Sequence, residues 1–275
     1  MINVEVIYKL HREQLARAIT LPLKPLANRT DNGSGVSCER ANDFWKMCEE
    51  WGATHPIHSH PYLDYIFDPS NDDLSSVKRF VEVLYAFCSR FHDCLFEMGA
   101  NTRDEEVRRA IAYNLYDEYG SGNARRGHLR LMRDLLNSMG YSEADIDAIR
   151  INPGAEQFMD ELLRYCREEE TLKALGCVCV GAECNGSTYF RKIYSAFQKK
   201  SCMRRADLGV LELHAGDDEE HRASMIQLIT PYLKDVDSRR MMQEGFLDSV
   251  HLFQQLWTSM AFYEGLVEKP MAMAA

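Results

Sequence analysis

The stretch LELHAGDDEEHRASM places His214, Asp218 and His221 at successive intervals of four and three residues. On an α-helix, side chains at i, i+4 and i+7 lie on one face. Seven residues span roughly 10 Å of helix rise, too far for both imidazoles to bind one ion easily. The same spacing suits two ions about 3.5 to 4 Å apart. The pattern therefore predicts a metal-binding helix face or, as the alternative supported by the neighbouring acidic residues, a solvated polar face.

A second group of candidate ligands is found in NLYDEYGSGNARRGH, where His128 follows Glu118 by ten residues. On an unbroken helix, two such side chains would lie about 80° apart and would not converge. The sequence Gly-Ser-Gly at 120–122 supplies a break. We therefore expect a bend that brings His128 back to the cavity that Glu118 faces.

A third segment, GCVCVGAECNGSTYF, is apolar and small apart from Glu183. A carboxylate is rarely fully buried without a partner, and a metal ion is a natural one. Glu183 is therefore a third candidate ligand.

Together these segments resemble the haem-oxygenase-like diiron oxidases and oxygenases, which share a helical fold with haem oxygenase, thiaminase-like and pyrroloquinoline-quinone-synthase proteins. The resemblance runs from about residue 60 to 266. It comprises an NLxxE…G…H element, the lone Glu183 and the HxxxDxxH motif. The matching residues are Asn114, Leu115, Glu118, Gly120, His128, Glu183, His214, Asp218 and His221.

The resemblance implies an O2-dependent enzyme with two iron ions and no haem. Three carboxylates and three imidazoles suit iron or manganese better than an iron–sulfur cluster or structural zinc. The resemblance also implies a small-molecule substrate, an external electron donor and a homodimer. The metal ligands would be Glu118, His128, Glu183, His214, Asp218 and His221.

The interval between Glu118 and His128 is similar to that of the N-oxygenating members, including the nitrosourea-forming enzyme, whereas fragmenting members use a shorter interval. N-oxygenation of an amine, amino acid or guanidine-like compound is thus the expected reaction, with desaturation or C–C cleavage as the alternative. N-oxygenating members add a carboxylate from the preceding helix. Here that position falls near His92 and Asp93. His92 could bind iron, accept a hydrogen bond from a ligand or simply pack in the core, and Asp93 could bind iron or lie on a solvated face.

Side chains near the predicted ligands are candidates for substrate contacts. Ser187 and Phe190 follow Glu183 by four and seven residues and would face the same cavity. Three arginines could bind a substrate carboxylate, with surface exposure as the alternative: Arg125, Arg126 and Arg191.

The elements that must position these residues are helices. Apolar residues recur at intervals of three and four, and no convincing alternating run predicts a strand. The predicted helices cover about 75–98, 102–119, 125–139, 155–185, 186–200, 206–230 and 238–266. We expect an all-α, haem-oxygenase-like bundle of about seven helices over 71–268, an N-terminal arm with short helices over 1–70, and a tail at 269–275. In the arm, His55, His58 and His60 are expected to belong to a loop or a helix start rather than a metal site.

Bulk properties exclude several classes of protein. The net charge of −10 opposes binding to a phosphate backbone. No apolar run approaches a membrane span and no secretory signal is present, so a cytoplasmic protein is expected. Nine cysteines, without a CxxC pair, are expected to be reduced and mostly buried. A thiaminase-like enzyme and a non-enzymatic helical binding protein are the alternatives of another class.

Overall fold

The computed structural model describes residues 43–48, 50, 60–216, 226–234 and 236–267. It confirms an all-α bundle, and no strand occurs within these ranges. The longer helices are α4 (Leu74–Asn101), α5 (Glu105–Glu118), α6 (His128–Ser138), α8 (Pro153–Glu168), α10 (Glu183–Phe197) and α13 (Val236–Tyr263). Shorter elements are α3 (Pro61–Phe67), η2 (Ala124–Arg126), α7 (Glu143–Asp147), α9 (Thr171–Leu175), η3 (Gly176–Ala182), η4 (Ser201–Met203), α11 (Gly209–Gly216) and η5 (Thr230–Lys234).

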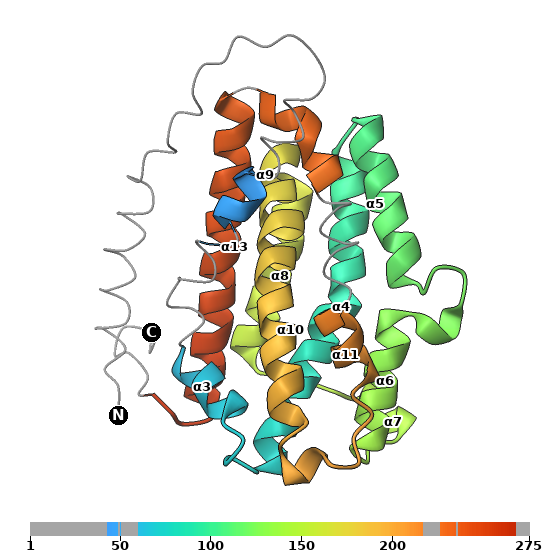
Figure 1. Cartoon of the computed structure of the whole chain (residues 1–275), viewed down its shortest axis with the longest axis vertical. Coiled ribbons are helices and arrows are strands. Elements are labelled where there is room, and N and C mark those ends of the chain that lie inside the picture. The colour runs from blue at the N-terminus through green and yellow to red at the C-terminus, as the bar shows by residue number, and fades with distance from the viewer. Residues whose placement is uncertain (1–42, 49, 51–59, 217–225, 235, 268–275) are drawn as a thin grey trace.

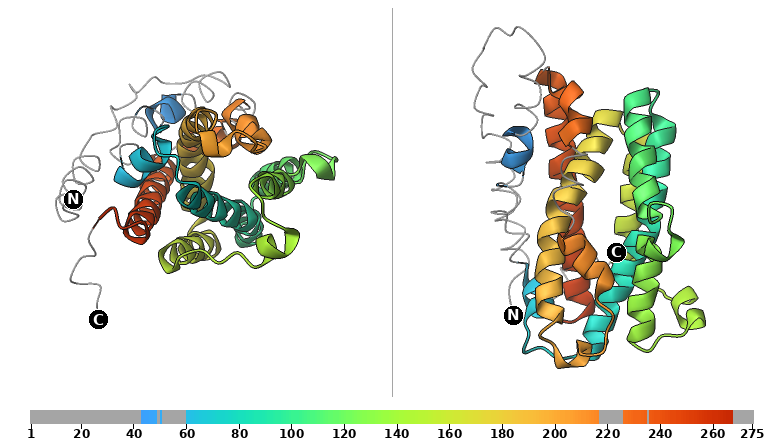
Figure 2. Two further views of the ribbon diagram at one scale, coloured as in Figure 1. Left: turned by 90° about the horizontal axis from the view of Figure 1, so that it is seen from below. Right: turned by 45° about the vertical axis from the view of Figure 1, so that its right-hand side comes forward.

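The arrangement of the helices brings distant parts of the sequence together. In Figure 1, α5 and α6 follow one another along one side of the bundle, and their connection bulges outward. The view along the bundle places α4 between these two helices and α10 (Figure 2). Because α11 contacts both α6 and α10, it lies beside the junction between α5 and α6.

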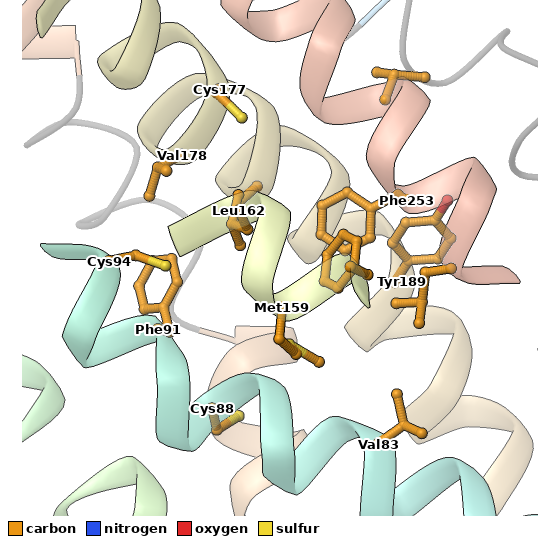
Figure 3. Packing of buried hydrophobic residues seen from close by; sticks show 14 of the residues in the cluster. Val83, Cys88, Phe91, Cys94, Met159, Leu162, Cys177, Val178, Tyr189 and Phe253 are labelled. Carbon is orange, nitrogen blue, oxygen red and sulfur yellow. The ribbon is translucent and has the colours of Figure 1, made fainter. Parts of the chain in front are cut away.

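The core forms where the apolar faces of α4, α8, η3 and α13 meet. The α4 residues Phe91 and Cys94 point toward Leu162 of α8 and Val178 of η3 (Figure 3). All four side chains are buried. The apolar periodicity that predicts α4 therefore corresponds to the face that this helix buries.

Element η3 is a π-helix that packs tightly against α13. A Cβ atom on Gly176 would lie 2.1 Å from the carbonyl oxygen of Met242. A Cβ atom on Gly245 would lie 2.0 Å from the carbonyl oxygen of Lys173. Lys173 belongs to α9, and the same Cβ atom would lie 2.9 Å from the backbone nitrogen of Cys177 in η3. The close approach of α13 to the backbones of α9 and η3 thus requires glycine at both positions.

Several predicted helix boundaries are wrong. The predicted helix over 155–185 ends at Glu168, and α9 and η3 follow it. A new helix does not begin at 186, because α10 runs from Glu183 through that position. The helix predicted from about 102 begins at Glu105, after the N-cap Asp104, whose carboxylate accepts hydrogen bonds from the backbone at 106 and 107.

Other local predictions are confirmed. His60 is the N-cap of α3, and its Nδ1 accepts a hydrogen bond from the backbone N–H of Tyr62. His55 and His58 lie outside the described residues. Of the α13 aromatic residues, Phe253 and Trp257 are buried in the core, whereas Tyr263 is exposed. Every cysteine in the described part is a free thiol.

The domain limits at 71 and 268 stay a prediction. Of the predicted arm, α3 packs against α13, with Tyr62, Leu63 and Ile66 fully buried. None of the described helices combines the length and the apolar character needed to span a membrane.

Candidate metal centre

The predicted chain reversal after Glu118 is observed, and it brings His128 back to the carboxylate. His128 Nδ1 lies 2.9 Å from Glu118 Oε2, and both side chains are buried. The reversal depends on Gly120, whose φ of +87° favours glycine. A Cβ atom there would lie 2.3 Å from the carbonyl oxygen of Asn123 and 2.6 Å from the backbone nitrogen of Gly127. The returning loop thus lies directly against the end of α5.

His214 of α11 joins this pair from another side of the bundle. Its ring centroid is 4.6 Å from that of His128, with the planes inclined at 64°. Phe190 of α10 also stacks on His214, with ring centroids 4.3 Å apart. The imidazole of His214 thus contacts both a second imidazole and an aromatic ring.

His92 of α4 approaches Glu118 from the preceding helix. Its Nε2 lies 3.3 Å from Glu118 Oε2, and the side chain is buried. Its ring stacks on Tyr119, with centroids 4.8 Å apart and planes inclined at 25°. Asp93, the other candidate at this position, is exposed. The sequence analysis did not single out Tyr119, because no local sequence signal marks this contact. Tyr119 is also more than half exposed.

The hydrogen-bond geometry assigns the imidazole tautomers. Burial alone would raise the pKa of Glu118, but contacts with His128 and His92 and nearby imidazole charge hold it well below its usual range. An ionised carboxylate only accepts hydrogen bonds, so the nitrogen of His92 that faces it carries a proton. His214 Nδ1 lies 2.8 Å from the carbonyl oxygen of Val210 and also carries a proton. In its neutral form, His214 therefore keeps the Nε2 lone pair as a metal-binding donor.

Cys88 of α4 is a further buried group that the sequence pattern did not place near the site. Burial, and to a lesser degree the charge of Glu118, raises the pKa of its thiol far above the ordinary value. A thiol of this kind stays protonated at neutral pH.

The structure describes only part of the predicted ligand set. Asp218 and His221 lie outside the described residues, as do the side chains of Glu183 and Ser187. The side chains that are described do not by themselves form a metal-binding group of three or more ligands. The backbone does place Glu183 as the first residue of α10, the helix that carries Phe190.

The arginines proposed as substrate contacts lie on the surface. Arg125 and Arg126 belong to η2 and are exposed, and Arg191 is exposed on α10. An open surface depression of about 330 Å³ lies elsewhere, between α4 and the junction of α8 and α9. It contains none of the predicted ligands.

The described donors suit an iron ion. A buried, ionised carboxylate and two nearby imidazoles supply nitrogen and oxygen donors of the kind that non-haem iron accepts. The side chains of Glu118, His92 and His128 are buried, and burial strengthens the electrostatic interactions between them.

The fold is that of haem oxygenase-like proteins. A domain with this fold from Shewanella denitrificans OS217 superposes with a TM-score of 0.65 at 13% identity, over 83% of this chain and 91% of the other. A CADD-like protein of unknown function from Nostoc punctiforme gives a TM-score of 0.69 at 14% identity, over 82% and 98% of the two chains. A TenA homolog from Pseudomonas syringae gives 0.61 at 10% identity, over 82% and 92%.

Within this fold, the chain belongs to a family of iron-containing redox enzymes, whose sequence model matches residues 78–254. It is also similar to 4-chloro-allylglycine synthase from Streptantibioticus cattleyicolor. The two are 26% identical over 206 residues, which are 74% of this chain and 77% of the synthase. The family thus agrees with iron, while this relative does not support the expected assignment to the N-oxygenating branch.

Proposed function

We propose that this protein is a non-haem diiron oxidase that uses O2 to oxidise an amino acid or a related amine. The observation that carries the proposal is the contact of Glu118 and His128, both buried, with the half-buried His214, three side chains that come from three separate helices. Its membership in a family of iron-containing redox enzymes supports the choice of metal. Glu183, Asp218 and His221 would complete a set of three carboxylates and three imidazoles for two iron ions.

The protein's own residues would hold and shield this centre. Bound iron would supply the redox chemistry with O2. Glu118 would compensate part of the metal charge from a buried position. His214 would keep one orientation, because Val210 holds its Nδ1 and Phe190 packs on its ring. This fixed geometry is what a reactive site requires of its protein.

For the reaction, oxidation at carbon is our first candidate. The name of the similar synthase designates a chlorinated, unsaturated amino acid, so we propose an amino-acid substrate and a desaturation or C–C cleavage. N-oxygenation is the second candidate, because the interval of ten residues between Glu118 and His128 resembles that branch. The family match favours either redox reaction over thiaminase-like chemistry or simple binding.

The test combines metal analysis with product labelling. Apoprotein would be loaded anaerobically with Fe(II), desalted, and incubated with ¹⁸O2 and a panel of amino acids and amines. We expect two irons per chain and a product whose formation depends on O2. An unsaturated product without label supports oxidation at carbon, whereas ¹⁸O bonded to nitrogen supports N-oxygenation. Failure to retain iron, together with no O2-dependent product, would overturn the proposal.

A further inference from the structure

The carboxylate of Glu118, a proposed metal ligand, is connected through His92 to a ring at the surface of the molecule. His92 contacts its carboxylate, and Tyr119 stacks on His92. Tyr119 is 54% exposed, whereas His92 is 4% exposed. The exposed ring of Tyr119 thus contacts His92, which in turn contacts a buried carboxylate of the candidate metal centre.

The backbone around Tyr119 is closely constrained. Tyr119 is the C-cap of α5, and its N–H donates to the carbonyl oxygen of Leu115. The next three residues have φ values of +87°, +51° and +88°, and the Ser121 hydroxyl donates to Asp117. This turn fixes the direction in which the Tyr119 ring leaves the helix. The ring therefore stacks on His92 from a position that the chain reversal itself defines.

The contact geometry distinguishes between the three roles that were open for His92 and favours a hydrogen bond to a ligand, with His92 as the donor. Its Nε2 faces Glu118 Oε2 as a hydrogen-bond donor, so a metal bound through this nitrogen would have to displace that bond. A hydrogen bond from an imidazole to a ligating carboxylate orients the carboxylate and leaves its other oxygen for the metal. Stacking on Tyr119 then fixes the plane of the imidazole that donates this bond.

We propose that His92 and Tyr119 form a positioning pair that orients Glu118 for metal binding, with His92 as hydrogen-bond donor rather than direct ligand. The proposal rests on the proposed function only in taking Glu118 as a ligand. The pair acts through Glu118 and does not contact the substrate. Its effect should thus be visible in metal binding alone, without turnover.

The experiment is an anaerobic titration of apoprotein with Co²⁺ alone, followed by its absorption bands. We expect His92→Leu and Tyr119→Leu to weaken Co²⁺ binding about 10-fold to 100-fold, the usual effect of removing such support. The shape of the cobalt spectrum should stay the same, because the direct ligands remain. His92→Gln, which keeps an N–H donor, and Tyr119→Phe, which keeps the ring, should bind nearly as the wild type does.

Tyr113→Leu is the matched control, since Tyr113 lies on α5 and is 65% exposed. Thermal melting and circular dichroism of each apoprotein separate a loss of folding from a loss of positioning. The proposal fails if Tyr119→Leu binds Co²⁺ as tightly as the control. It also fails if His92→Gln is as weak as His92→Leu with an altered spectrum, which would make His92 a ligand. Full Co²⁺ binding by Glu118→Gln would instead overturn the proposed metal site itself.

Discussion

Two buried polar groups of this bundle are held in different ways. Lys200, which follows α10, is 1% exposed, and its Nζ donates to the backbone carbonyl oxygens of Asp68 and Asn71. Both acceptors belong to the short connection between α3 and α4. The carboxylate of Glu118, in contrast, is surrounded by imidazoles from other helices.

The difference separates a structural polar group from the one that we propose as a metal ligand. The ammonium group of Lys200 is satisfied by main-chain acceptors of one loop, so it ties that loop to the end of α10. Glu118 gathers titratable side chains that each lose solvation on burial. Such a cluster is expected where a protein binds a charged ligand, and groups with strongly shifted pKa values concentrate at such sites.

The largest effect should follow from Glu118→Gln. The amide keeps the size of the side chain but removes the negative charge that a metal ion requires, so affinity for Fe(II) or Co²⁺ should fall by more than the roughly 100-fold typical of outer contacts. Metal content after desalting measures this. Glu97→Gln, which breaks only a surface ion pair with Arg167, is the control. If Glu118→Gln kept the metal content of the wild type, Glu118 would have a structural role, as we expect for Lys200.

Lys200→Met should lower the stability of the fold without changing metal binding. Methionine fills the space but leaves two buried carbonyl groups without the charged donor, so the free energy of unfolding should fall by about 3 kcal/mol. Urea denaturation measures this loss. Metal binding by the folded variant should be unchanged, because none of the described metal-centre residues contacts Lys200. A variant that lost metal but not stability would contradict this distinction.

The sequence predicted the parts of the site that depend on local signals. The Gly-Ser-Gly break is such a signal, and the resulting contact of His128 with Glu118 is observed. The stack of Tyr119 on His92 depends on how α4 and α5 are rotated against each other, which no local pattern records. The π-helix before Glu183 likewise follows from glycine packing against α13, whereas its sequence is only apolar and small.

Gly120→Ala tests whether the chain reversal itself supports the metal centre. The new Cβ would meet two backbone atoms of the returning loop at 2.3 and 2.6 Å, so the loop must shift. Gly122→Ala has a similar φ of +88°, but its Cβ would meet only the Tyr116 hydroxyl at 3.2 Å. We expect a loss of about 1 to 2 kcal/mol for left-handed alanine at 122, and a larger loss with weaker metal binding at 120. Equal effects in denaturation and Co²⁺ titration would show that the close packing at Gly120 does not matter.

The smallest effect concerns the pH dependence of Lys200. Burial lowers the pKa of this ammonium group below its ordinary 10.5, with opposing contributions from Cys202, Asp68 and Asp72. Between the folded and unfolded pKa values, the unfolded chain therefore binds more protons, and stability rises with pH.

Lys200→Met lacks this proton-linked contribution, so the stability margin of the wild type over the variant should be larger at pH 10 than at pH 7. Urea denaturation of both proteins at the two pH values measures the change, and groups common to both cancel in the comparison. A margin that shrinks with pH would mean that the two carbonyl acceptors and the nearby carboxylates stabilise the ammonium form by more than burial opposes it. The charge of Lys200 would then be stabilised by its contacts, as that of Glu118 is. The two groups would differ only in the kind of contact, main-chain carbonyl groups for Lys200 and imidazole side chains for Glu118.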